Sequence, residues 1–138
     1  MEKKIYIASD HAGYELKSKL CNFFKTFIDL GTNSNERVDY PDFAYKLTSK
    51  VSQNNDSRGV LICGTGVGMS IAANREKRIR AGLVNSVEIA RLIRQHNDAN
   101  VLVLPGRFMK EVDAIECIQV FLDTEFESGR HKQRIEKL

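Results

Sequence analysis

The sequence has few cysteines and no long apolar run. No stretch of its 138 residues approaches 18 consecutive apolar side chains, so we expect no membrane span. The apolar run after the N-terminal lysines is too short for a signal peptide. The three cysteines are odd in number, far apart and without a C-x-x-C pair, which argues against a disulfide framework and against a thiolate zinc site. We therefore expect a cytoplasmic protein with free thiols.

Basic residues are in slight excess, and the excess is local. Lysine and arginine number 21 against 18 acidic residues, which gives a net charge of +3. The last nine residues hold four of these basic residues and one acidic residue, so they account for the whole excess. Because a nucleic-acid binder spreads basic charge over a face, we expect no nucleic-acid partner. This tail suits a small anion, and a solvated tail without a ligand is an equally good reading.

Buried-strand and amphipathic-helix patterns alternate along the chain. Its length and its 42% hydrophobic residues predict a single domain over residues 1–138. Strands are expected at Lys4–Ser9, Phe27–Leu30, Gly59–Cys63, Arg80–Val84 and Val101–Leu104. Helices are expected at Tyr14–Phe27, after a cap at Asp42, from about Met69, and at Ser86–Gln95, Lys110–Thr124 and Arg130–Leu138. The alternation predicts an α/β, Rossmann-like, three-layer domain: an open parallel sheet of about five strands with helices on both faces.

A glycine-rich turn follows the most apolar strand, at the sheet edge where such folds bind ligands. The turn Gly64-Thr65-Gly66-Val67-Gly68 is G-x-G-x-G, which differs from the dinucleotide fingerprint G-x-G-x-x-G. The phosphate-loop motif G-x-x-x-x-G-K-[ST] is also missing, so neither a nicotinamide cofactor nor a nucleoside triphosphate is favoured. Glycines before a helix let backbone N–H groups hold an anion, and a tight turn without a ligand is the less favoured alternative.

Cys63 comes directly before this turn, at the end of the central strand. A helix N-terminus favours a thiolate, which could act as a proton-abstracting base or as a nucleophile. Taken alone, Cys63 would be better interpreted as a buried structural cysteine. The adjacent glycines reverse that preference in favour of a functional thiol.

Other polar candidates lie at strand and helix ends. Asp10 and His11 follow the first strand, and His96-Asn97 precede the last strand. Arg130 and Arg134 are four residues apart, so a helix would present both to one phosphate, although two solvated arginines are equally compatible with the spacing.

Six blocks of this sequence resemble one family, ribose-5-phosphate isomerase B, which includes the galactose-6-phosphate isomerase subunits. The blocks are Ser9–Lys17, Asp39–Ala44, Cys63–Ser70, Ala73-Asn74, Arg91 with His96–Leu102, and Gly129–His131 with Arg134. They occur in order over residues 4 to 136. The resemblance implies an isomerase that interconverts ribose 5-phosphate and ribulose 5-phosphate through a cis-enediolate, in the non-oxidative branch of the pentose phosphate pathway.

The resemblance also implies a role for each candidate residue and no metal or organic cofactor. Cys63 would move the proton between C1 and C2, with Thr65 polarising the reacting groups, and His96 would be the acid that opens the sugar ring. The amides of the turn would stabilise the enediolate. The expected substrate-binding residues are Asp10, His11, Gly64, Gly66, Val67, Gly68, Asn97, Arg107, Arg130 and Arg134. Pro105 departs from the family pattern and restricts the backbone ahead of Arg107.

Members of this family place the site between two subunits. The resemblance therefore implies a homodimer with shared active sites, in which the C-terminal helix of one chain serves the other, and it leaves pairing into tetramers open. Three other functions remain alternatives at this stage: an isomerase of a six-carbon sugar phosphate, a non-catalytic sugar-phosphate-binding module, and a Cys–His hydrolase.

Overall fold

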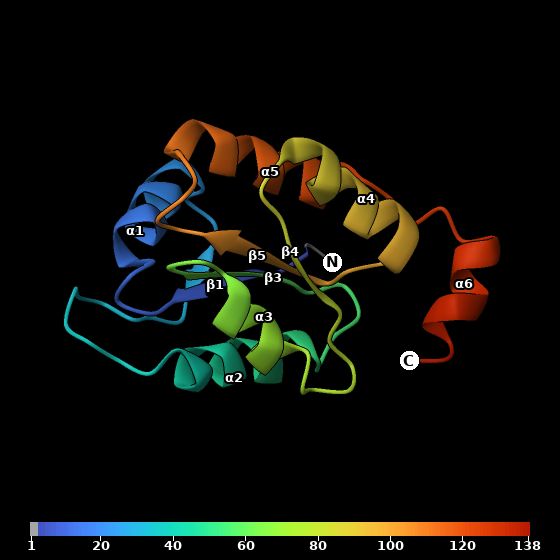
Figure 1. The fold of residues 1–138 in the computed structure, drawn as a ribbon, viewed down its shortest axis with the longest axis horizontal. Coiled ribbons are helices and arrows are strands. Elements are labelled where there is room, and N and C mark those ends of the chain that lie inside the picture. Colours follow the sequence, from blue (N-terminus) through green and yellow to red (C-terminus); the bar gives the residue numbers. More distant parts are fainter. Residues whose placement is uncertain (1–2) are drawn as a thin grey trace.

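The computed structural model describes residues 3–138, and one parallel sheet organises them (Figure 1). The strands within this range are β1 Ile5–Ser9, β2 Ile28–Asp29, β3 Arg58–Cys63, β4 Ala81–Leu83 and β5 Val101–Pro105. The helices are α1 Tyr14–Phe23, α2 Tyr40–Val51, α3 Val67–Ala73, α4 Val87–Asn97, α5 Glu111–Asp123 and α6 Arg130–Ile135. The sheet order is β2-β1-β3-β5-β4, and each paired neighbour is parallel. This confirms the predicted α/β class and the open parallel sheet.

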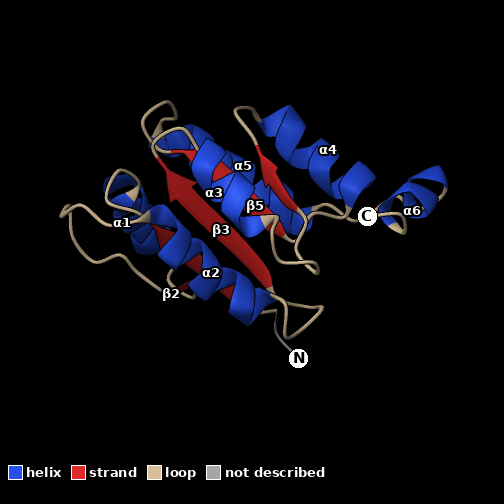
Figure 2. Ribbon diagram, turned by 60° about the horizontal axis from the view of Figure 1, so that its bottom comes forward, coloured by secondary structure: helices blue, strands red, loops and turns tan. Residues whose placement is uncertain are grey.

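Helices cover both faces of the sheet, and each face has its own core (Figures 1 and 2). Ile7, Val60 and Ile62 pack toward α1, α4 and α5, whereas Ala8 and Leu61 pack toward α2 and α3. Successive strand residues point to opposite faces, so strands buried on both sides read as continuous apolar runs. This explains why every residue from Val60 to Cys63 is buried.

The helix α6 lies apart from both layers, beyond α4 at one end of the molecule (Figure 1). It packs against α4, the helix next to the edge strand β4. No helix among residues 3–138 has the length and apolar character needed to cross a bilayer.

Two expected helix boundaries are wrong, for local reasons. The first helix ends at Phe23 rather than Phe27, because the chain leaves helical geometry at Phe24. The rings of Phe24 and Phe27 instead stack 4.5 Å apart against the core, which buries the apolar pattern without a further helical turn. The second helix is preceded by Asp39, not by Asp42, which lies in its first turn. Pro41 lacks an N–H, and the first turn is where a helix needs none.

Candidate active site

The loop after β1 is held against the end of β3. The Asp10 N–H donates to the Ile62 carbonyl oxygen at 3.2 Å, and the Asp10 carboxylate accepts the Gly13 N–H at 3.0 Å. A Cβ on Gly13 would lie 2.6 Å from the Ile62 carbonyl oxygen, so only glycine allows this approach. The buried Asp10 side chain is thereby fixed at the carboxyl edge of the sheet, the edge that ends in Cys63.

His11 has a defined ring orientation. Its Nδ1 accepts the Val38 N–H at 3.2 Å, which ties it to the loop before α2. A neutral imidazole whose Nδ1 is an acceptor carries its proton on Nε2. His11 therefore offers a hydrogen-bond donor beside Asp10, as a sugar or phosphate oxygen would require.

The turn after Cys63 depends on glycine at Gly66. Gly66 has φ +80°, and a Cβ there would collide with the Leu83 side chain. The hydroxyl of Thr65 accepts the Val67 N–H at 3.2 Å, so it caps the start of α3, which begins two residues before the expected Met69. First-turn N–H groups of a helix lack carbonyl partners within that helix and point out from its N-terminus. Because α3 begins directly after the turn that follows β3, this helix N-terminus lies at the same edge of the sheet as Cys63.

Arg107 joins this group despite the proline before it. Pro105 is the last residue of β5 and pairs opposite Cys63. The next two backbone N–H groups bind back to the turn, from Gly106 to the Cys63 carbonyl at 2.8 Å and from Arg107 to the Gly64 carbonyl at 3.0 Å. A Cβ on Gly64 would lie 3.4 Å from Arg107 Cδ and Nη1. The Arg107 guanidinium therefore lies directly beside the glycine-rich turn.

Tyr40 is a residue that sequence reasoning did not assign to the site. It starts α2, and its ring covers Gly68, where a Cβ would come within 2.7 Å of Tyr40 Cζ. The side chain is 38% exposed. The closeness of Tyr40 to the turn comes from the packing of α2 on α3, which no local pattern encodes.

Of the three free cysteines, Cys63 alone is next to this turn. Burial and the nearby Asp113 and Glu116 raise the pKa of Cys117 to about 11. Burial and the nearby Asp29 also raise the pKa of Cys21. Both thiols are therefore poor candidates for a thiolate, and each lies within a helix away from the glycine-rich turn.

The remaining predicted residues gather at the end of α4. His96 and Asn97 close this helix, and Asp98 follows with φ +47°. Two arginines hold the turn: Arg94 Nη1 donates to Asp98 Oδ1 at 2.8 Å, and Arg80 Nη2 donates to the Asp98 carbonyl oxygen at 2.8 Å. The position of His96 and Asn97 is therefore set by side chains that the sequence motifs did not include.

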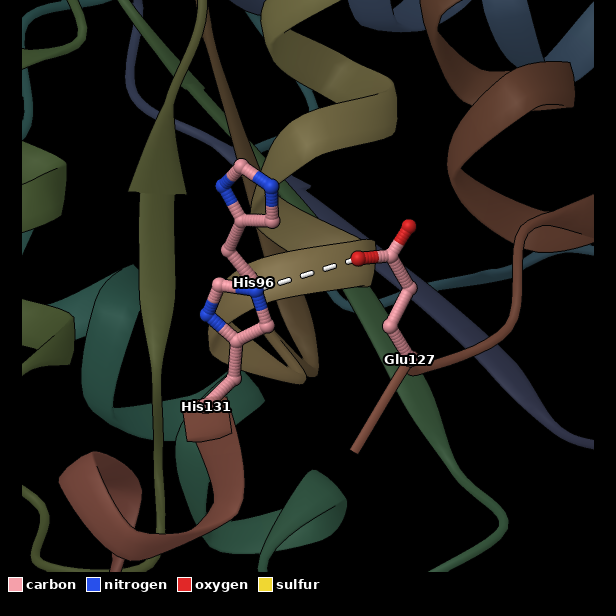
Figure 3. Close-up of side chains that lie close together, drawn as sticks. All are labelled: His96, Glu127 and His131. Atoms are coloured by element: carbon pink, nitrogen blue, oxygen red, sulfur yellow. Dashed lines mark ion pairs between the residues drawn. The ribbon is translucent and has the colours of Figure 1, made fainter. Parts of the chain in front are cut away.

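His96 also contacts α6. Its ring stacks on the ring of His131, with centroids 4.4 Å apart (Figure 3). His131 is buried, whereas Arg130 and Arg134 on the same short helix are exposed. The two arginines therefore belong to a helix that contacts the end of α4, and their exposed side chains are available to an anion.

The predicted site residues thus form two groups, which the topology puts at opposite edges of the sheet. The carboxyl-edge group contains Asp10, His11, Cys63, Gly64, Thr65, Gly66, Val67, Gly68 and Arg107. The amino-edge group contains His96, Asn97, Arg130 and Arg134. β5 starts only four residues after Asn97, and its pairing with β3 runs from Gly59↔Val101 to Cys63↔Pro105. Four residue steps separate the edges by about 13 Å along the strands.

Comparison with known proteins places the chain in a family. The family model described as Ribose/Galactose Isomerase matches residues 5–138. The chain is 41% identical to ribose-5-phosphate isomerase B of Escherichia coli K12, covering 99% of this chain and 94% of that protein.

Solved structures agree over nearly the whole chain. A ribose 5-phosphate isomerase from Thermotoga maritima has a TM-score of 0.96 and 49% identity, covering 99% of this chain and 97% of that one. Ribose-5-phosphate isomerase B from Mycoplasma genitalium, with bound ribulose-5-phosphate, has a TM-score of 0.94 and 46% identity, covering 99% of this chain and 94% of that one. This chain belongs to the ribose/galactose isomerase family.

Proposed function

We propose that this protein is a ribose-5-phosphate isomerase, which interconverts ribose 5-phosphate and ribulose 5-phosphate in the non-oxidative pentose phosphate pathway. The observation that carries the proposal is the position of Cys63, at a strand end between the glycine-rich turn and the backbone of Gly106. The 46% identity to a structure that holds ribulose-5-phosphate supports the same substrate. A thiolate base suits a reducing compartment, so we expect the enzyme in the cytoplasm.

Cys63 acts as the base in this proposal. The thiolate takes the proton from C2 of the open-chain aldose, and the electron pair moves to the carbonyl oxygen at C1 to form a cis-enediolate. The same thiol then returns the proton to C1, the C2 hydroxyl loses its proton as the carbonyl forms at C2, and the C1 oxygen takes up a proton to become the hydroxyl of the ketose. No electrons are gained or lost overall. N–H groups of the turn face the negative oxygen, and such donors contribute about 2.7–4 kcal/mol each in other enzymes.

Ring opening comes first and uses His96. The protonated imidazole gives its proton to the ring oxygen and the bond from that oxygen to C1 breaks. The C1 hydroxyl loses its proton to solvent water as the aldehyde forms. General acids of this kind contribute about 10²–10⁴-fold. Asp10 and Asn97 hold sugar hydroxyls, and His11, Arg107, Arg130 and Arg134 bind the phosphate end.

The proposal requires two chains for each site, because the acid and the base lie at opposite edges of one sheet. Val67 and Ile71 on α3 are four residues apart and about half exposed, at 50% and 53%. Apolar side chains on one helix face beside a functional turn are typical of a surface that another chain covers. We therefore propose a homodimer in which the carboxyl-edge group of each chain meets the amino-edge group, including α6, of the other.

Turnover in the presence of EDTA tests the proposed reaction. The purified protein is incubated with ribose 5-phosphate and the chelator, and ribulose 5-phosphate is followed over time. We expect full activity with the chelator and a lower kcat/KM for galactose and allose 6-phosphates, because one more carbon changes the distance from base to phosphate. Absence of turnover of ribose 5-phosphate would refute the proposal, and binding without proton exchange in D₂O would indicate a non-catalytic module.

A further inference from the structure

His131 is buried against His96 and is not used by the mechanism above. Its side chain is 7% exposed, and the two rings are inclined by only 17°. The segment before α6 is tied to α4 by the Glu127 N–H, which donates to the carbonyl of Gln95 at 3.1 Å. Ser128 and Gly129 both have positive φ, which turns the chain so that α6 returns to the end of α4. The contact of the two rings is thus part of how α6 is attached.

The side chains of His96, Glu127 and His131 lie close together but are not arranged as a metal site. Ligand atoms of His96, Glu127 and His131 lie within 4.8 Å of one another. Two imidazoles bind one ion when their ring nitrogens converge on it, because the bonding lone pairs lie in the ring planes. Figure 3 shows the two ring nitrogens of His96 on the side of the ring that points away from His131, and the one ion pair drawn joins Glu127 to His131. The geometry is that of a stacked pair rather than of a ligand set.

The charges around His131 favour its neutral form. Desolvation lowers the pKa of His131, and the nearby positive charges of His96, Arg130 and Arg134 lower it further. Glu127, whose Oε1 lies 3.8 Å from Nε2, acts in the opposite direction but is half exposed. The pKa of His131 is therefore held low, and this ring favours its uncharged form.

We propose that His131 is a positioning residue: its buried ring packs against the ring of His96 and holds it in the orientation needed to open the sugar ring. This inference rests on the proposed function, since it assigns His96 to ring opening. It does not give His131 a contact with the substrate. An acid oriented by a further group is a common arrangement in enzymes that transfer protons.

Two substitutions distinguish a positioning role of the His131 ring from a general role in packing. His131→Ala removes the ring, whereas His131→Phe keeps a flat ring of similar size that cannot carry a proton. Each variant is assayed for turnover of ribose 5-phosphate, which requires ring opening. Each is also assayed for exchange of the C1 proton of ribulose 5-phosphate into D₂O, which requires proton transfer by Cys63 but no ring opening, because this ketose is open-chain. Thermal unfolding identifies variants that fail to fold.

We expect His131→Ala to lower kcat with ribose 5-phosphate about tenfold, less than loss of the acid itself, while C1 exchange stays within about twofold. His131→Phe is expected to retain turnover within about threefold. Unchanged turnover in His131→Ala, an equal loss of turnover and exchange in a folded variant, or a loss in His131→Phe as large as in His131→Ala would overturn the inference. A wild-type protein inactive in both assays would instead refute the proposed function, and the inference with it.

Discussion

The carboxyl-edge and amino-edge groups are built in different ways. Backbone hydrogen bonds between strand ends fix the first, as in the contacts from Gly106 and Arg107 to the turn after Cys63. Side chains fix the second, because Arg80 and Arg94 hold the turn after His96 and His131 packs on its ring. In the proposed mechanism the first supplies a base and backbone donors, and the second supplies an acid and two guanidinium groups. Neither group contains the full chemistry of an isomerase.

Removing the proposed base of the carboxyl-edge group should lower activity more than any other change considered. We expect Cys63→Ala to lower turnover of ribose 5-phosphate by about 10³-fold, because no other thiol is near the turn. C1 exchange of ribulose 5-phosphate in D₂O should fall with it. Cys21→Ala is the matched control and should keep full activity, since Cys21 lies on α1 away from the turn. Exchange that persists in Cys63→Ala would assign the base to another residue.

Combining two inactive chains tests whether the groups act across subunits. We expect His96→Asn to lower turnover by about 10²-fold, because the ring-opening acid is lost. Cys63→Ala and His96→Asn chains are then co-expressed with different tags, and the hybrid that carries both tags is purified. A dimer of this kind has one site with both groups intact, so we expect about half of the wild-type activity. A hybrid as inactive as its parents would mean that the two groups do not meet between chains.

The contribution of α6 to phosphate binding should appear as a change in KM. We expect Arg134→Ala to raise KM for ribose 5-phosphate by about 10- to 100-fold and to change kcat much less, because a charge-assisted bond to phosphate is made in both ground and transition states. Lys132→Ala, an exposed neighbour on the same helix, is the control and should leave KM unchanged. Equal increases of KM in the two variants would indicate that the basic tail attracts the phosphate through its overall charge.

The smallest effect on activity is expected for a residue that holds the amino-edge group in place without contacting the substrate. Arg94 is 5% exposed and donates to the carbonyl oxygens of Ala99 and Thr124 as well as to Asp98. We expect Arg94→Ala to lower the free energy of unfolding by about 2–3 kcal/mol in urea titrations. Arg78→Ala, which breaks an exposed pair with Glu76, should cost less than about 0.5 kcal/mol. Similar losses in both would contradict a special role for the buried arginine.

The sequence was most informative where chemistry and local pattern coincide. The buried run Val60–Cys63 and the glycines after it predicted a central strand and a turn, and β3 and Gly66 confirm them. The order of the strands and the approach of Tyr40 to Gly68 depend on how helices pack across the sheet, which spacing does not encode. The stacking of His131 on His96 joins residues 35 positions apart through a loop with two positive φ angles, so no motif could reveal it.

The exposed side chains of Val67 and Ile71, beside the turn after Cys63, imply that activity depends on the concentration of the protein. If each working centre needs two chains, the specific activity of a solution should fall on dilution, as dimers dissociate and leave each chain with half of the required groups. A ligand that bridges both chains would oppose this loss, so sugar phosphate should keep dilute enzyme assembled. In such an enzyme the bound substrate would also stabilise the dimer that converts it.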